Sequence, residues 1–209
     1  VREFGYKSVT HRLEKFGLLR KNSLMIHGVW TDKSEWELLK EHGCFLVHNP
    51  SSNLNNAVGI LDLIGAMEAG VITGFGTDGM HNLPLKEYQL GYYLSHIKRS
   101  LPSAGWMEAF SALVNNSYMA SSIFGRDIGA IRPGADADLA FFDYEPPTMI
   151  NADNAVGHLL FGMINSRVRH TVSMGKFLMK DFELQLDLDI KEVIARSTEI
   201  AGKLWSRLK

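Results

Sequence analysis

Three side chains that suit acid–base or metal chemistry stand at the ends of short apolar runs in the first 80 residues. His27 closes the run in "NSLMIHG", His48 closes the run in "CFLVHNP", and Asp78 follows "VITGF". The carboxyl ends of neighbouring parallel strands share one edge of a sheet, and α/β folds carry their chemistry at that edge. Imidazole and carboxylate suit Zn²⁺ or Fe²⁺ and can also transfer protons during hydrolysis. The pattern therefore predicts one site where these three residues converge.

The glycines around Asp78 permit a different interpretation. Gly74, Gly76 and Gly79 spell G-x-G-x-x-G, the dinucleotide fingerprint. That fingerprint needs a helix beginning at the third glycine and an acidic residue about 20 positions later. Here "MHNLP" follows the third glycine, and residues 97–99 are Ile-Lys-Arg. Asp78 would also repel a pyrophosphate. We therefore expect the glycines to make room around Asp78, and a nicotinamide-dependent oxidoreductase is the weaker alternative, which NAD binding would revive.

Each candidate also has a purely structural interpretation. An aspartate after a strand is often the N-cap of the next helix, but Pro84 delays that helix here, which favours a functional Asp78. His27 could be a neutral histidine bonded to backbone. His48 begins "HNPSSN", a turn-forming stretch that its ring could simply brace. His81, close to Asp78 on the same loop, is typical of a surface histidine.

The elements that must position these residues can be predicted from periodicity. Short apolar runs alternate with helical patterns up to Asp78, which indicates βαβ units and a buried parallel sheet. Asp32 and Glu35 form a helix-start pair. Later elements are of another type. The expected helices cover 32–43, 60–69, 84–99, 105–125, 153–163 and 189–209, with a loop at 51–59, a strand at 139–144 and two strands around 174–176.

Bulk composition limits the classes of function. The chain has 209 residues, 45% of them hydrophobic, and a formal net charge of −1. Such a charge gives no reason to expect nucleic acid or an anionic membrane as partner. No apolar stretch reaches the roughly 18 residues that a membrane-spanning helix needs. The single cysteine, Cys44, excludes an internal disulfide framework and fits a reducing, cytoplasmic location.

Four stretches in a specific order resemble one known family. "MIHGVW", "VHNPSSNLNNAVG", "GFGTDG" and "IGAIRPGADADLAFFD" are similar to the C-terminal half of an amidohydrolase-superfamily enzyme, in the chlorohydrolase and aminohydrolase branch that includes adenosine-type and guanine deaminases. The resemblance runs from about Tyr6 to Lys209. It implies an α/β fold: the C-terminal part of a (β/α)8 TIM barrel, with about three βα units, part of a small composite β-sandwich and a C-terminal helix. The expected boundaries are 1–124 for the barrel portion, 125–185 for the sandwich segment and 186–209 for the helix.

The same resemblance implies roles for individual residues. Asp78 matches the aspartate that ligates a divalent metal, Zn or Fe, and shuttles a proton from the hydrolytic water. His27 matches the histidine that orients or polarises substrate or hydroxide. His48 and Asn53 are weaker candidates for substrate binding, and His81 is a further one. The implied reaction is hydrolysis of a carbon–nitrogen bond in a small-molecule substrate, a cyclic amidine or nucleobase-like compound.

The sequence also departs from the family pattern. None of its eight histidines has another histidine two positions on, so the H-x-H pair is absent. The fifth-strand histidine with its nearby glutamate is missing too. Catalytic zinc normally takes three protein ligands. Because the chain also begins with Val1, we expect a piece of a longer enzyme that is inactive alone. The alternative is a catalytically degenerate barrel that serves as a binding or assembly partner. Raw sheet edges would favour self-association, as a homo-oligomer, or recruitment of a partner.

Overall fold

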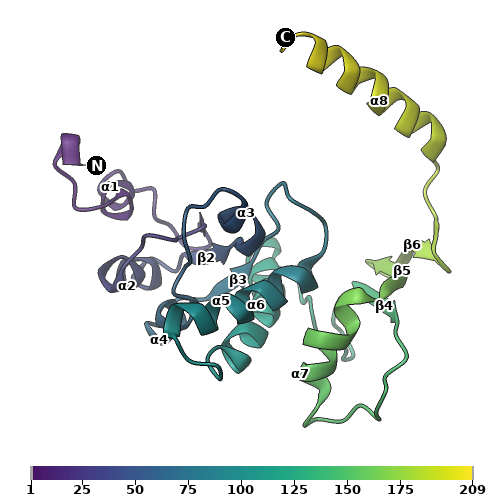
Figure 1. Ribbon diagram of the computed structural model, residues 1–209, viewed down its shortest axis with the longest axis horizontal. Helices are drawn as coiled ribbons and strands as arrows, with labels where there is room; N and C mark the ends of the chain where they lie inside the picture. Colours follow the sequence, from purple (N-terminus) through teal and green to yellow (C-terminus); the bar gives the residue numbers. More distant parts are fainter. Residues whose placement is uncertain (1, 209) are drawn as a thin grey trace.

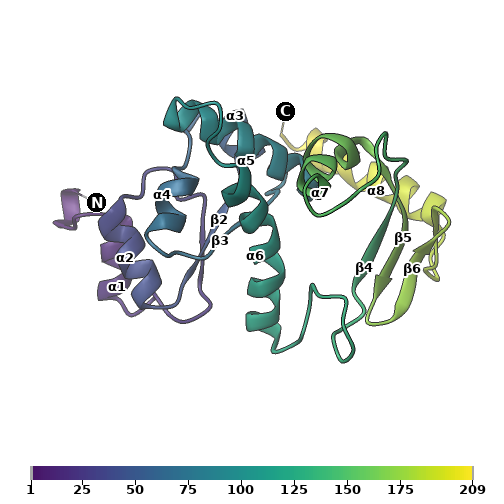
Figure 2. The same ribbon diagram turned by 90° about the horizontal axis from the view of Figure 1, so that it is seen from below.

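Residues 2–208, which the computed structural model describes, contain one parallel and one antiparallel β-sheet (Figure 1). Figure 2 shows the two sheets on opposite sides of the long helix α6. The parallel sheet has the order β1-β2-β3, with β1 at Leu24–Ile26, β2 at Phe45–His48 and β3 at Thr73–Phe75. The antiparallel sheet follows chain order, with β4 at Leu139–Asp143, β5 at Arg167–Ser173, β6 at Lys176–Lys180 and β7 at Glu183–Leu184.

The helices follow most of the predicted ranges. They are α1 (Val9–Lys15), α2 (Lys33–Glu41), α3 (Pro50–Asn55), α4 (Leu63–Glu68), α5 (Pro84–Arg99), α6 (Trp106–Phe124), α7 (Ala155–Gly157) and α8 (Ile190–Ser206), with short turns at Arg2–Phe4, His158–Gly162 and Met163–Asn165. The loop predicted over 51–59 was wrong for residues 51–55, because α3 begins at Pro50, a helix-starting position that the fixed φ of proline favours. Helix α1 and strand β7 were not predicted.

The predicted start of α2 is confirmed in detail. The Asp32 side chain accepts hydrogen bonds from the backbone amides of Ser34 and Glu35, and the Glu35 side chain accepts from the Asp32 amide. This reciprocal capping box satisfies amides that the first helical turn leaves without partners. The helix ends at Glu41, and Gly43 follows with φ +64°. Residues close together in the sequence therefore determine where the helix of the first βα unit begins and ends.

The register of the parallel sheet brings the ends of its strands together. Ile26 pairs with Val47, and His48 pairs with Phe75. The ladder continues past the strands, because the His27 amide donates to the Val47 carbonyl at 2.8 Å and the Gly76 amide donates to the His48 carbonyl at 2.9 Å. The residues after β1, β2 and β3 therefore emerge at one edge, as the sequence predicted.

Two buried clusters hold the barrel portion together. The first packs α2 and α4 against the sheet and contains Leu19, Trp36, Leu39, Cys44, Leu46, Leu61, Ala66 and Val71. The second packs α5 and α6 against β3 and contains Leu63, Phe75, Tyr88, Ala109, Ala112 and Leu160. Burial of this kind contributes about 25 cal/mol per Å² of apolar surface removed from water. The helices thus anchor the sheet whose end carries the candidate site.

Two asparagines of α6 pair with the outer edge of β3. The Asn116 side chain accepts a hydrogen bond from the Phe75 amide and donates one to the Phe75 carbonyl, both at 2.9 Å. The neighbouring Asn115 side chain donates to the Thr73 carbonyl at 2.9 Å. Backbone groups buried without a partner cost free energy, so these amides take the place of a fourth strand.

We expect Asn116→Ala to destabilise the fold, because it leaves both backbone groups of Phe75 without partners. The expected loss is about 1–3 kcal/mol of unfolding free energy. Urea unfolding of the variant and of an Asn55→Ala control on the exposed end of α3 would measure it. An unchanged midpoint for Asn116→Ala would contradict the edge-pairing role.

The part of the chain after α6 forms the antiparallel sheet and the terminal helix. Arg126 bonds Asp136 at 2.8 Å, and Asp138 accepts from the Ser173 hydroxyl at 2.8 Å, so both aspartates hold turns and strands together. Helix α8 extends away from the rest of the molecule in Figure 1, and none of its residues is buried. Among residues 2–208, no helix combines the length and apolar character needed to cross a bilayer. The predicted domain boundaries at residues 124 and 185 stay predictions.

The predicted α/β class with about three βα units is confirmed. Three short parallel strands, each followed by helices, form the first sheet, and they do not close into a barrel within residues 2–208. The outer edge of β1 carries no strand among these residues, and Leu24 and Ile26 are about half exposed there. The free edge lies beside the first of the candidate site residues.

Candidate functional site

The side chains of His27 and Asp78 meet at the end of the parallel sheet. Their Nε2 and Oδ2 atoms are 3.7 Å apart, and the two side chains are 42% and 44% exposed, so both groups face open space. Both residues have left-handed backbones, with φ of +71° and +48°. Such conformations cost free energy outside glycine and collect at functional sites. The structure thus brings together the two residues predicted to be catalytic.

Asp78 is oriented by two hydrogen bonds. Its Oδ2 accepts from the Ser52 hydroxyl at 2.7 Å, and its Oδ1 accepts from the Gly79 amide at 2.7 Å. The Ser52 hydroxyl, followed by the Gly79 amide and the neighbouring His27, lowers the pKa of Asp78 below its ordinary value. The carboxylate is therefore ionised near neutral pH and held in one direction, as a ligand or proton acceptor must be.

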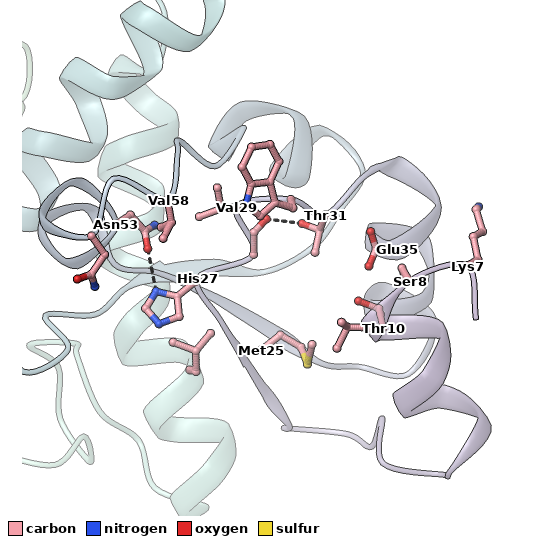
Figure 3. A pocket seen from close by; sticks show the side chains of 15 residues that line it. Lys7, Ser8, Thr10, Met25, His27, Val29, Thr31, Glu35, Asn53 and Val58 are labelled. Atoms are coloured by element: carbon pink, nitrogen blue, oxygen red, sulfur yellow. Dashed lines mark hydrogen bonds between the residues drawn. The ribbon is translucent and has the colours of Figure 1, made fainter. Parts of the chain in front are cut away.

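Asn53 orients the His27 ring from the other side. The Asn53 Oδ1 atom lies 2.8 Å from His27 Nδ1, a contact drawn in Figure 3. An amide oxygen can only accept, so the proton of a neutral His27 ring is on Nδ1. This leaves Nε2, the atom that faces Asp78, able to accept a proton.

His48 lies behind this pair. Its side chain is 1% exposed, and its Nδ1 is 3.4 Å from the Asn53 amide nitrogen. Burial, together with the nearby His27, lowers the pKa of His48 from 6.5 to about 3, so the ring stays neutral. Asn53, which is also 1% exposed, bonds His48 through its amide nitrogen and His27 through its amide oxygen. The predicted contact of His48 and Asn53 with substrate remains untested, and this burial favours a supporting role.

The neutral His48 predicts a dependence of stability on pH. Its pKa is lower in the folded chain, so between about pH 6.5 and 3 the unfolded chain binds a proton that the folded chain does not. The free energy of unfolding should therefore fall as pH falls through this window, at up to roughly 1.4 kcal/mol per pH unit from this group. Urea unfolding at several pH values should show a shallower slope for His48→Phe; an identical slope would contradict the assignment.

His81 lies near Asp78, but its ring is engaged within the chain. Nε2 is 2.8 Å from Glu87 Oε1 and 3.0 Å from the Ser51 hydroxyl, and Nδ1 accepts from the Leu83 amide at 3.2 Å. The side chain is only 14% exposed. The sequence indicated either a surface histidine or a substrate contact. The low exposure argues against a surface histidine, and the contacts of both ring nitrogens within the chain do not favour a substrate contact.

The glycines of "GFGTDG" do different things. A Cβ on Gly74 would lie 2.2 Å from Asn116 Oδ1, and one on Gly76 would lie 2.3 Å from Asn49 Oδ1, so both make room for these side chains, whereas the prediction was room around Asp78. A Cβ on Gly79 would meet nothing within 4 Å, so the same interpretation was wrong there. Helix α5 begins at Pro84 and not at the third glycine. This geometry lacks the helix N-terminus that a dinucleotide fingerprint requires.

A cavity of about 610 Å³ opens beside His27 (Figure 3). Met25, Val29, Trp30 and Val58 supply apolar walls, and Asp78 does not line it. The cavity runs along the free edge of β1 to α1. By itself it does not define a substrate site.

The chemistry of the donor groups can be compared with that of a divalent-metal site. Asp78 offers an ionised, half-exposed carboxylate, which fits one ligand position. Within residues 2–208 no group of three or more His, Cys, Asp or Glu side chains is arranged to hold a metal ion. A catalytic zinc normally takes three protein ligands, so the donors described here would complete such a site only together with others.

Two residues that shape the site were not predicted from sequence. Ser52 was read as part of a loop, and Glu87 as one charge on an amphipathic helix. The clue for Glu87 was available: it falls on the face of α5 that also carries the buried Tyr88, where a charge requires a partner. Ser52 gave no comparable signal, because serine is common in turns.

Comparison with known proteins relates the whole chain to one group. A model described as "Amidohydrolase family" matches residues 1–178. A 5-methylthioadenosine/S-adenosylhomocysteine deaminase of Haloarcula marismortui is 33% identical over 209 residues, which cover 99% of this chain and 48% of that protein. A 5'-deoxyadenosine deaminase of Methanopyrus kandleri is 32% identical over 210 residues, which cover 98% of this chain and 48% of that protein. The chain spans about half the length of these relatives.

Solved structures show the same fold. A zinc-bound adenosine deaminase from Xanthomonas campestris matches with a TM-score of 0.78 at 23% identity, over 93% of this chain and 45% of that one. Escherichia coli guanine deaminase matches with a TM-score of 0.70 at 21% identity, over 86% and 43% of the respective chains. At these identities the likeness concerns the fold alone, and it agrees with the predicted barrel-derived architecture.

Proposed function

Because the chain belongs to the amidohydrolase family, we propose that it is the C-terminal half of a metal-dependent hydrolase that cleaves carbon–nitrogen bonds other than peptide bonds. The observation that carries the proposal is the convergence of His27 and Asp78, 3.7 Å apart at the end of the parallel sheet. Sheet ends of this kind carry catalytic groups in α/β folds. The reaction belongs to the intact protein, and this chain alone is expected to be inactive.

In the proposed mechanism Asp78 is the base. Its ionised carboxylate accepts a proton from the attacking water and passes it to the departing amine. The hydrogen bonds from Ser52 and Gly79 hold the carboxylate in one orientation toward the attacking water, which favours proton transfer. The proton is therefore transferred by a group whose orientation is fixed at the end of the parallel sheet.

His27 has a complementary role in this proposal. With its Nδ1 proton donated to Asn53, a His27 ring that enters the reaction with a second proton on Nε2 can donate a hydrogen bond to negative charge that develops on the substrate, and it keeps that proton. Asn53 fixes this ring by its hydrogen bond, and His48 acts only through Asn53; both side chains are buried. His81 is not needed as a substrate contact, because Glu87 and Ser51 engage its ring.

We propose that Asp78 also ligates a divalent metal, zinc or iron, because carboxylate and imidazole suit both. When bound, such an ion supplies Lewis-acid polarisation of the water. The remaining ligands would have to come from the part of the enzyme that this chain does not span. The residues described here contribute one ligand, its orientation and the adjacent imidazole.

The proposed substrate is a small aminated nitrogen heterocycle. The relatives in the comparison are deaminases of 5-methylthioadenosine, S-adenosylhomocysteine and 5'-deoxyadenosine, judging by their names. We therefore propose an adenosine-like compound whose exocyclic amino group is replaced by the oxygen of water and leaves as ammonia.

Ammonia release tests the proposal. The full-length protein, loaded with zinc or with iron, should release ammonia from at least one of 5-methylthioadenosine, S-adenosylhomocysteine, 5'-deoxyadenosine and guanine. The Asp78→Asn variant prepared in the same way should release none above background. Equal release by both proteins would refute the assignment of Asp78.

A catalytically degenerate barrel is the second candidate, and one observation favours it. The described residues hold no three-ligand metal group. If the full-length protein binds neither zinc nor iron in equilibrium dialysis and releases no ammonia, a binding or assembly role replaces the enzymatic one. Tight binding of one metal ion excludes that alternative.

A further inference from the structure

Glu87 is a buried carboxylate that the proposed reaction does not use. It lies in the first turn of α5, and its side chain is 0% exposed. A carboxylate is costly to bury unless hydrogen bonds and partners compensate it. Its Oε2 accepts from the Ser51 amide at 2.9 Å, and its Oε1 lies 2.8 Å from His81 Nε2. His81 lies on the loop that contains Asp78, and Ser51 lies next to Ser52, which donates a hydrogen bond to Asp78.

The His81 ring lies against both Glu87 and Ser51. Its Nδ1 accepts a hydrogen bond from the Leu83 amide, so the ring proton is on Nε2. That proton is shared with the Ser51 hydroxyl at 3.0 Å, while Nε2 also lies 2.8 Å from Glu87 Oε1. Among residues 2–208 this buried oxygen has no hydrogen-bond partner of its own. Glu87 therefore holds Ser51 by a hydrogen bond and touches His81, and Ser51 in turn bonds His81.

These contacts join three segments of the chain around the candidate base. Ser51 precedes Ser52, whose hydroxyl donates to Asp78 Oδ2 at 2.7 Å. His81 follows Asp78 by three residues on the loop between β3 and α5. Glu87 thus bonds the start of α3 through Oε2 and contacts the loop after β3 through Oε1, which lies 2.8 Å from His81 Nε2. Movement of either segment would change the direction of the Asp78 carboxylate.

We infer that Glu87 is a positioning residue: its buried carboxylate clamps the Asp78–His81 loop against the start of α3 and so fixes the Ser52–Asp78 hydrogen bond. The inference rests on the proposed function, because it assigns Glu87 a role in orienting the proposed base. Neither His27 nor the metal ligands hold the Asp78 loop in this way. Replacing the Glu87 carboxylate by an amide of the same shape should therefore change the orientation of the Asp78 carboxylate.

Glu87→Gln in the full-length enzyme tests the inference. With 5-methylthioadenosine as substrate, kcat should fall about 10- to 100-fold while KM changes little, because misplaced catalytic groups slow chemistry more than binding. Glu192→Gln, on the exposed helix α8, should match the wild type. A crystal structure of the variant should show the Ser52–Asp78 hydrogen bond broken. A wild-type kcat, or an intact hydrogen bond, would overturn the inference.

A double-mutant cycle separates positioning from general stability. If Glu87 acts through Ser52, adding Glu87→Gln to Ser52→Ala should cost no further kcat. Fully additive losses would overturn the inference. Should Glu87→Gln fail to fold, His81 decides: His81→Gln retains a donor for Glu87 and should keep most of the wild-type kcat, whereas His81→Leu should not. Equal kcat for the two His81 variants would contradict the clamp.

Failure of this inference is distinguishable from failure of the proposed function. If Asp78→Asn is inactive and Glu87→Gln behaves like the wild type, only the role of Glu87 is wrong. If Asp78→Asn is as active as the wild type, the proposed function fails first. The crystal structure of Glu87→Gln does not depend on any activity.

Discussion

Asp78→Asn is expected to lower the turnover of the full-length enzyme by at least about 10³-fold, because it removes the proposed general base. Asparagine has the same shape and tolerates the left-handed backbone at this position, where φ is +48°. The loss should therefore come from chemistry and not from folding. The carboxylate is also the proposed metal ligand, so elemental analysis should show that most of the bound metal is lost as well.

The matched control for this experiment is Asp127→Asn. Asp127 is also a surface carboxylate, but it pairs with Arg132 in the segment that follows α6, and not at the end of the parallel sheet. Its amide variant should keep both the turnover and the metal content of the wild type. If Asp78→Asn and Asp127→Asn behave alike in the ammonia assay, Asp78 is not the base.

His27→Asn is expected to lower kcat about 10²- to 10³-fold, the usual cost of removing a preorganised donor to developing charge. Asparagine again tolerates the left-handed conformation, with φ +71° at this position. Because His27 is proposed to act on substrate and not to bind the metal, the variant should keep its metal content. Steady-state kinetics and elemental analysis on the same preparation would separate the two roles.

His42→Asn provides the comparison for this variant. The His42 ring pairs with Glu14 at 3.5 Å on the helical side of the molecule, away from the strand ends. Its loss should leave kcat unchanged. A metal content for His27→Asn as low as that of Asp78→Asn would make His27 a ligand and contradict the division of roles proposed here.

Strand-end placement could be predicted from the sequence, because it follows from a short-range pattern. The runs before His27, His48 and Asp78 are short and apolar, and parallel strands of this kind end at a common edge. The convergence of His27 and Asp78 follows from that register. Periodicity gives the order of the elements and the face on which their ends meet.

The second layer of the site could not be predicted in the same way. Ser52 and Asn53 lie on α3, which was interpreted as a loop because Asn, Pro and Ser favour turns. The partnership of Glu87 with His81 and Ser51 joins residues up to 36 positions apart. Contacts of this kind depend on how helices pack on the sheet, and hydrophobic periodicity does not determine them.

The edges of the sheet show a similar limit. The sequence indicated raw strand edges, yet on β3 the side chains of Asn115 and Asn116 take up the free backbone groups. Two adjacent polar residues within an apolar helix were the available signal, although their partner strand lies about 40 residues away in the sequence. The outer edge of β1 carries no such cover among the described residues.

Anomalous diffraction from crystals of the zinc-loaded full-length protein tests most directly whether one carboxylate and one imidazole share a catalytic pocket. The proposed arrangement predicts an ion bound by Asp78 Oδ2 at roughly 2.0–2.2 Å, with the His27 ring facing the same pocket and Ser52 still bonded to the carboxylate. An ion held without Asp78, or the two side chains turned to opposite sides of the strand ends, would contradict it.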